Sequence, residues 1–80
     1  MHNTAYYQNQ RLQLENVALD DIAAHFGTPC FVYSKNALEQ SFLAYKNALG
    51  DRSHLICYAV KSNSNLAVLQ TLANLGAGFD

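Results

Sequence analysis

One lysine in this sequence stands where chemistry is expected. Lys61 follows LICYAV, the longest uninterrupted apolar run, which covers residues 55–60. In open parallel sheets and α/β barrels, ligands and catalytic groups collect at the carboxyl ends of the strands. The position therefore predicts a nucleophilic amine. From position alone, the simpler interpretation is a lysine that only marks the exit of the strand into solvent.

A carboxylate at Asp80 is the second candidate, because it ends the segment GFD, which has the pattern of a strand beginning. Strand alternation places Cys57, Ala59 and Lys61 on one face of the first segment, and Gly78 and Asp80 on one face of the second. If the two strands are neighbours, Asp80 lies beside Lys61. Ala59 and Gly78 then form the floor of a cavity with room for a flat ligand. The alternative role for Asp80 is to cap a helix or a turn.

The remaining reactive side chains give weak signals. The three histidines, His2, His25 and His54, have no metal-ligand spacing and no acidic cluster beside them, so no metal site is expected. Cys30 and Cys57 lie in apolar runs, and we expect both to be reduced, small and buried. The sequence contains no glycine-rich nucleotide loop and no serine or cysteine nucleophile motif.

The elements that must position Lys61 and Asp80 follow from hydrophobic spacing and helix boundaries. Ser34 or Asn36 is expected to cap the longer helix, and Asn36 with Glu39 has the spacing of a capping box. Gly50 and Gly76 are the expected helix ends. The expected elements are a strand over 30–33, a helix over 36–49, a strand over 55–60, a helix over 65–75 and a strand from 78.

The first third of the chain gives less regular patterns. Residues 1–10 are polar, and we expect a frayed end. Partial alternation over residues 11–19 favours a short strand in its first half. A short helix should follow, with Asp20 as its cap, Asp21 in its first turn and Gly27 at its end.

The order strand, helix, strand, helix, strand predicts an α/β fold with parallel strands. The run over residues 55–60 is apolar at every position, as in a parallel strand covered by helices on both faces. So few strands cannot cover both helices. We therefore expect these residues to be the N-terminal part of a larger α/β protein and not to be stable alone.

The composition and net charge of the chain indicate which kinds of molecule it binds. Of the 80 residues, 50% are hydrophobic and 14% are charged, and the net charge is −1. This composition excludes intrinsic disorder and gives no electrostatic support for a nucleic acid or a membrane surface as partner. The N-terminus has neither the basic start nor the apolar run of a signal peptide. The expected partner is a small molecule, and the expected location is the cytoplasm.

Three strings in the sequence resemble one enzyme family. Residues 58–80, YAVKSNSNLAVLQTLANLGAGFD, resemble the cofactor-lysine segment of the fold-type III pyridoxal-phosphate decarboxylases. Residues 26–34, FGTPCFVYS, and residues 14–29, LENVALDDIAAHFGTP, resemble the branch of bacterial diaminopimelate decarboxylases. The resemblance extends over residues 12–80.

The resemblance assigns roles to single residues. It implies that Lys61 is catalytic and holds pyridoxal 5'-phosphate covalently, and that Ala59 and Asp80 lie close to the cofactor. It also implies the N-terminal part of a (β/α)8 TIM barrel of the alanine racemase/decarboxylase type. Residues 1–27 would then include a strand of a second all-β domain, and residues 28–80 would begin the barrel.

The implied reaction is removal of CO₂ from meso-2,6-diaminopimelate to give L-lysine, in a homodimeric enzyme with an amino-acid substrate. An isolated chain of this length is expected to be inactive. The resemblance leaves related ornithine, arginine or carboxynorspermidine decarboxylases and amino-acid racemases as alternatives, and FGTPCFVYS favours the diaminopimelate branch. A non-enzymatic pyridoxal-phosphate carrier is disfavoured by the strand within residues 11–19. An α/β folding unit with an exposed lysine is the structural alternative.

Overall fold

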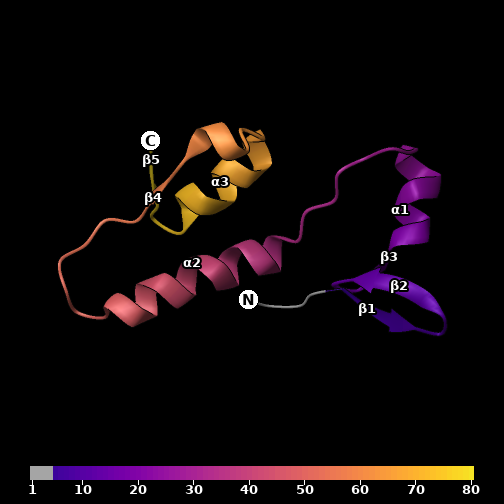
Figure 1. Cartoon of the computed structure of the whole chain (residues 1–80), viewed down its shortest axis with the longest axis horizontal. Helices are drawn as coiled ribbons and strands as arrows, with labels where there is room; N and C mark the ends of the chain where they lie inside the picture. The colour runs from indigo at the N-terminus through magenta and orange to yellow at the C-terminus, as the bar shows by residue number, and fades with distance from the viewer. Residues whose placement is uncertain (1–4) are drawn as a thin grey trace. The chain divides into compact units, whose positions relative to one another are not determined.

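The computed structural model describes residues 5–80 (Figure 1). The chain forms two compact units: an N-terminal unit, Met1–Ser34, and a C-terminal unit, Lys35–Asp80. The predicted division into a β-domain segment, 1–27, and a barrel segment, 28–80, concerns the domains of a longer protein and stays a prediction.

The N-terminal unit contains a three-stranded antiparallel sheet in the order β1-β2-β3. The strands are β1 Ala5–Gln8, β2 Arg11–Leu14 and β3 Val17–Ala18. The short turn between β1 and β2 places Asn9 and Gln10 in the left-handed region, at φ 53° and 64°, as tight hairpins require. The short strand expected in the first half of residues 11–19 is confirmed at Arg11–Leu14. The expectation of a frayed end is wrong for residues 5–8, which pair with β2, and residues 1–4 lie outside the described part.

Helix α1, Leu19–Phe26, follows the sheet directly. Asp20 was expected to cap this helix, but Ala18 occupies the cap position and Asp20 lies in the first turn with Asp21. The helix starts earlier because β3 runs straight into it. Arg11 of β2 donates to Asp21 Oδ1 at 2.7 Å, and this bond raises the pKa of Arg11. Gly27, at φ 84°, ends the helix as predicted.

The strand predicted over residues 30–33 does not form. Phe31 is 89% exposed, and the part of the chain that the structure describes pairs no strand with this segment. Strand-forming residue types do not suffice without a partner that bonds their main-chain groups. Cys30 is therefore a free, exposed thiol rather than a buried side chain.

The C-terminal unit is built on a parallel pair of strands joined by a helix. The predicted parallel pairing and helical crossover are confirmed. The strand expected over residues 55–60 is shorter, because its ladder pairs only with β5 and a 3₁₀ turn begins at Val60. The elements are α2 Lys35–Leu49, β4 Cys57–Tyr58, η1 Val60–Ser62, α3 Leu66–Asn74 and β5 Gly78–Phe79.

Helix boundaries in this unit follow the sequence closely. Helix α2 starts directly after Ser34, so Asn36 lies inside the helix and the capping box with Glu39 is wrong. Gly50 follows the last residue of α2 with φ 59°, and Gly76 follows α3 with φ 99°. Both glycines adopt the left-handed backbone that commonly ends helices.

Both helices of the C-terminal unit cover the same face of the β4–β5 pair. Phe42 of α2 and Val68 and Leu72 of α3 form the buried core, and Ile56 and Tyr58 pack against them. The prediction of a strand covered on both faces is therefore not met among the described residues. The two helices share one core because each has a single apolar face.

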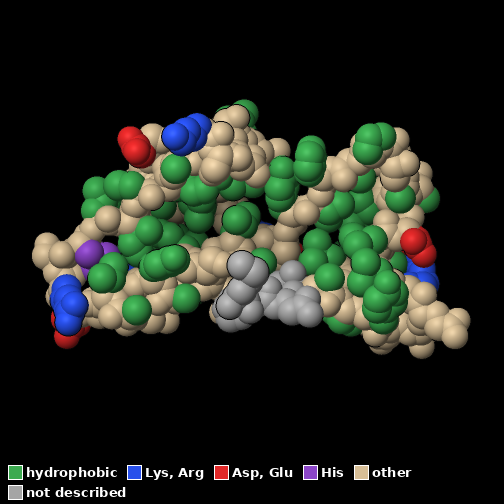
Figure 2. All heavy atoms as spheres, viewed as in Figure 1, with side chains coloured by type: hydrophobic (Ala, Val, Ile, Leu, Met, Phe, Trp, Pro, Cys, Tyr) green, Lys and Arg blue, Asp and Glu red, His purple; other side chains and the backbone are tan. Residues whose placement is uncertain are grey.

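Much apolar surface stays exposed in each unit. Figure 2 shows hydrophobic side chains across the surfaces of both units. Among residues 5–80, only Ala18, Phe42, Val68 and Leu72 are buried hydrophobic residues. No helix within this described range is long and apolar enough to cross a bilayer. That the chain is not stable alone stays a prediction.

Candidate functional site

Lys61 lies in the 3₁₀ turn η1, at the carboxyl end of β4. This placement confirms that the lysine follows a strand of a parallel pair. The expected strand alternation from Ala59 to Lys61 is wrong, because the turn starts at Val60 and ends the extended backbone. The Lys61 side chain is exposed, and its amine has no hydrogen-bond or ion-pair partner among residues 5–80.

The backbone brings Asp80 next to Ala59. The Asp80 N–H donates to Tyr58 O at 2.9 Å, and Asp80 O accepts from Val60 N at 3.0 Å. These bonds continue the register in which Cys57 faces Gly78, so Asp80 is opposite Ala59 on the same face of the sheet. Asp80 thus lies at the same carboxyl end of the strand pair as the turn that carries Lys61.

Phe79 points to the opposite face, toward the helices. Its ring lies 6.5 Å from that of Tyr58 in an edge-to-face arrangement. It also lines a surface hollow with Val60 of η1 and with Leu69 and Ala73 of α3. The strand register that the sequence suggested is therefore confirmed, with Phe79 against a helix and Asp80 on the other face.

On the sheet face that carries Ala59 and Asp80, one detail differs from the expectation that Ala59 and Gly78 form the floor of a cavity. Gly78 is opposite Cys57, and a Cβ built on Gly78 would lie 3.0 Å from Cys57 Sγ. The thiol therefore occupies the space above Gly78, so Ala59 alone is left as the floor. Cys57 is exposed, contrary to expectation, because no helix of the described chain covers this face.

A set of hydrogen bonds holds the turn that carries Lys61. Ser62 Oγ donates to Ala59 O at 2.8 Å, and Ser62 N donates to the same oxygen at 3.1 Å. The Tyr58 hydroxyl donates to Asn63 O at 2.9 Å, and it shares the single Ser62 Oγ proton with Ala59 O through a longer contact of 3.2 Å. The role of Tyr58 in this turn was not predicted from the sequence. The available signal was a tyrosine three residues before Lys61, followed by short polar side chains.

The same turn leads into the cap of α3. Asn65 Oδ1 accepts from Ala67 N at 2.9 Å and from Val68 N at 3.2 Å. Asn63 Oδ1 in turn accepts from Asn65 N at 3.0 Å. Asn65 is therefore the N-terminal cap of α3. The lysine turn and the start of α3 form one hydrogen-bonded segment.

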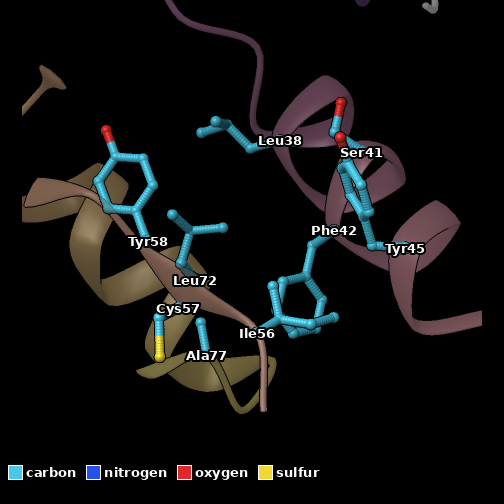
Figure 3. A pocket seen from close by; sticks show the side chains of 9 residues that line it. All are labelled: Leu38, Ser41, Phe42, Tyr45, Ile56, Cys57, Tyr58, Leu72 and Ala77. Carbon is cyan, nitrogen blue, oxygen red and sulfur yellow. The ribbon is translucent and has the colours of Figure 1, made fainter. Parts of the chain in front are cut away.

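An apolar groove of about 260 Å³ lies on the helix face, between α2 and β4 (Figure 3). Leu38 and Phe42 line it from α2, and Ile56 and Tyr58 line it from the region of β4. None of the three predicted site residues lines this groove. It is a packing gap between a helix and the sheet, separate from the edge at which Lys61 lies.

The geometry at Lys61 supports carbonyl chemistry. His2 lies outside the described residues, and residues 5–80 contain no cluster of three side chains able to hold a metal ion. At the strand edge, an exposed amine without an internal partner can condense with an aldehyde and release water. Lys61 therefore fits a cofactor that carries an aldehyde, and the open face beside Ala59 and Asp80 is available to the rest of that molecule.

Comparisons with known proteins agree with this chemistry. A family model described as "Pyridoxal-dependent decarboxylase, pyridoxal binding domain" matches residues 35–80. A diaminopimelate decarboxylase of Vibrio cholerae is 53% identical over 75 residues, which are 94% of this chain and 18% of the relative. That of Pseudomonas aeruginosa is 53% identical over 78 residues, 98% of this chain and 19% of the relative.

A solved structure has the same fold. The crystal structure of AQ1208 from Aquifex aeolicus matches with a TM-score of 0.90 and 44% sequence identity, over 96% of this chain and 19% of that one. The chain thus spans about a fifth of the length of the proteins that it matches.

Proposed function

Because this chain belongs to the family of pyridoxal-dependent decarboxylases, through their pyridoxal-binding domain, we propose that Lys61 attaches pyridoxal 5'-phosphate covalently. One observation carries the proposal: within the matched region, the Lys61 amine is exposed and unpaired in a turn at the carboxyl end of a parallel strand. Other lysines of the C-terminal unit, Lys35 and Lys46, lie on α2.

The residues around Lys61 take complementary roles in this proposal. The Lys61 amine holds the aldehyde carbon of the cofactor, and when released it can carry a proton to the carbon that loses CO₂. Ala59 leaves room on the sheet face, and Asp80 opposite it supplies a negative charge close to the bound group. When bound, pyridoxal phosphate supplies the ring that takes up the electron pair left by CO₂.

The proposed reaction is decarboxylation of meso-2,6-diaminopimelate to L-lysine. It is supported by relatives named diaminopimelate decarboxylase, at 53% identity in Vibrio cholerae and Pseudomonas aeruginosa. We propose that these residues act within a protein of the length of those relatives, with a (β/α)8 barrel and a second all-β domain. A cytoplasmic homodimer is part of the same proposal, and it is supported by the family resemblance alone.

Covalent labelling tests the role of Lys61. Borohydride reduction of the full-length protein loaded with pyridoxal phosphate, followed by peptide mapping, should place the label on Lys61. Lys61→Ala should abolish the label and leave the circular-dichroism spectrum unchanged. The control Lys46→Ala, an exposed lysine of α2, should keep it. A label on Lys35 or Lys46 would contradict the proposal.

The same preparation tests Asp80 and the substrate. Asp80→Asn should still carry the label on Lys61 but release CO₂ more slowly, because the main-chain bonds of Asp80 are retained and only its charge is lost.

Wild-type rates of CO₂ release from meso-diaminopimelate, ornithine and arginine should decide the substrate. Faster CO₂ release from ornithine or arginine would instead indicate a related decarboxylase that acts on that amino acid.

A further inference from the structure

The bonds around Tyr58 suggest a role beyond the core. We propose that Tyr58 is a positioning residue, whose hydroxyl fixes the turn that presents the Lys61 amine to the cofactor; this inference rests on the proposed function. The hydroxyl donates to Asn63 O at 2.9 Å, and it shares the Ser62 Oγ proton with Ala59 O through a longer contact of 3.2 Å. Both partners, Ser62 and Asn63, follow Lys61 in the chain. The Tyr58 hydroxyl therefore holds the part of the turn that lies C-terminal to the lysine.

Tyr58 is suited to this role because its ring is anchored. The ring is half-buried, packs against the core formed by Phe42, Val68 and Leu72, and meets the ring of Phe79 edge to face. A hydroxyl on a ring fixed by packing is itself held in place, unlike one on an exposed side chain.

The turn is thus held on both sides of Lys61. Before the lysine, Val60 N donates to Asp80 O at 3.0 Å and ties the chain to β5. After the lysine, the Tyr58 hydroxyl holds Ser62 and Asn63. The lysine side chain is long and flexible, so the backbone of the turn is the part whose position the fold can fix. Fixing it reduces the range of amine positions and favours attack on the aldehyde carbon.

Tyr58→Phe in the full-length protein tests this role, because it removes the hydroxyl and keeps the ring. The N–H groups of Ser62 and Asn63 donate to Ala59 O and Val60 O, each at 3.1 Å, so their hydrogen exchange reports on the turn. Loss of one net hydrogen bond predicts exchange about fivefold faster at these two amides, with the amides of α2 unchanged. The rate at which the apoprotein captures pyridoxal phosphate on Lys61 should fall in parallel.

Tyr45→Phe is the matched control. Tyr45 also belongs to the C-terminal unit, is 68% exposed, and its hydroxyl has no partner among the described residues. It should change neither the exchange rates nor the capture rate. Ser62→Ala is the second variant: it removes a donor to Tyr58 and Ala59, and it should also speed exchange at the turn. A purely structural role of Tyr58 would instead speed exchange throughout α2 and α3.

The outcomes separate this inference from the proposed function. If wild-type protein carries the cofactor on Lys61 and Tyr58→Phe changes neither the exchange nor the capture rate, the inference is overturned and the proposed function stands. If the wild type attaches no cofactor to Lys61, the proposed function fails and the positioning role toward the cofactor fails with it.

Discussion

The two units are built in opposite ways. In the N-terminal unit, β1, β2 and β3 are neighbours in the sequence, joined by tight turns, and Ala18 is the only buried hydrophobic residue among residues 5–34. In the C-terminal unit, β4 and β5 pair in parallel across a helix, and the core draws on two helices. The first unit depends on local hydrogen bonds, and the second depends on contacts between distant residues.

This difference in strand topology explains which unit can bring reactive side chains together. An antiparallel hairpin returns the chain at once, so its strand ends alternate between the two edges of the sheet. A parallel pair brings the carboxyl ends of both strands to one edge, and here these ends carry Lys61 and Asp80. The C-terminal unit, whose strands pair across a helix, is thus the unit that can bring reactive groups together.

The largest loss of stability is expected from a substitution in the core of the C-terminal unit. Leu72→Ala removes a buried side chain of α3 and should lower the free energy of unfolding by about 2–5 kcal/mol. In the full-length protein, hydrogen exchange should accelerate in α2 and α3 and stay unchanged in β1 and β2. Leu66→Ala, on the same helix but 81% exposed, is the control and should change stability by about 0.5 kcal/mol or less. Equal effects of the two substitutions would contradict the core assignment.

A smaller effect is expected at the start of α3. Asn65→Ala removes the side-chain oxygen that accepts from Ala67 N and Val68 N, and should cost about 1 kcal/mol in chemical denaturation. Asn65→Asp keeps an oxygen at the cap and should retain most of the stability. If the alanine and aspartate variants unfold at the same denaturant concentration, the cap does not stabilise the helix.

The smallest effect is expected in the N-terminal unit, at the exposed contact between Arg11 and the start of α1. Arg11→Ala removes the 2.7 Å bond to Asp21 and the 3.7 Å contact with Asp20, and should lower the melting temperature less than Asn65→Ala does. The difference from wild type should shrink in high salt, because salt screens exposed charges. A difference that persists in 1 M salt would mean that packing, not charge, is lost.

The pH dependence of this contact has a defined direction. The hydrogen bond and charge of Asp21 raise the pKa of Arg11 in the folded chain. A raised pKa of a basic group stabilises the folded state below the ordinary pKa of arginine, and the contribution is lost only as the pH rises through the folded pKa. The Arg11 contribution should therefore be constant across neutral pH.

The helices follow the sequence pattern more closely than the strands do. Gly27, Gly50 and Gly76 each follow a helix, because a left-handed glycine after a helix is a local property of the chain. The residue types at CFVY favoured a strand equally clearly, but residues 30–33 form none. A strand needs hydrogen bonds from a second segment, and its own residues do not encode whether that partner is present.

At the site, the sequence by itself determined that Lys61 ends an apolar segment and that Asp80 ends the next one, in the order of a parallel crossover. Only the tertiary structure decided that Asp80 is opposite Ala59, that the Cys57 thiol lies above Gly78, and that Lys61 lies in a turn held by Tyr58. Spacing along the chain fixes which residues share an element. The pairing register and the bonds across a turn depend on groups from separate segments, which meet only when the chain has folded.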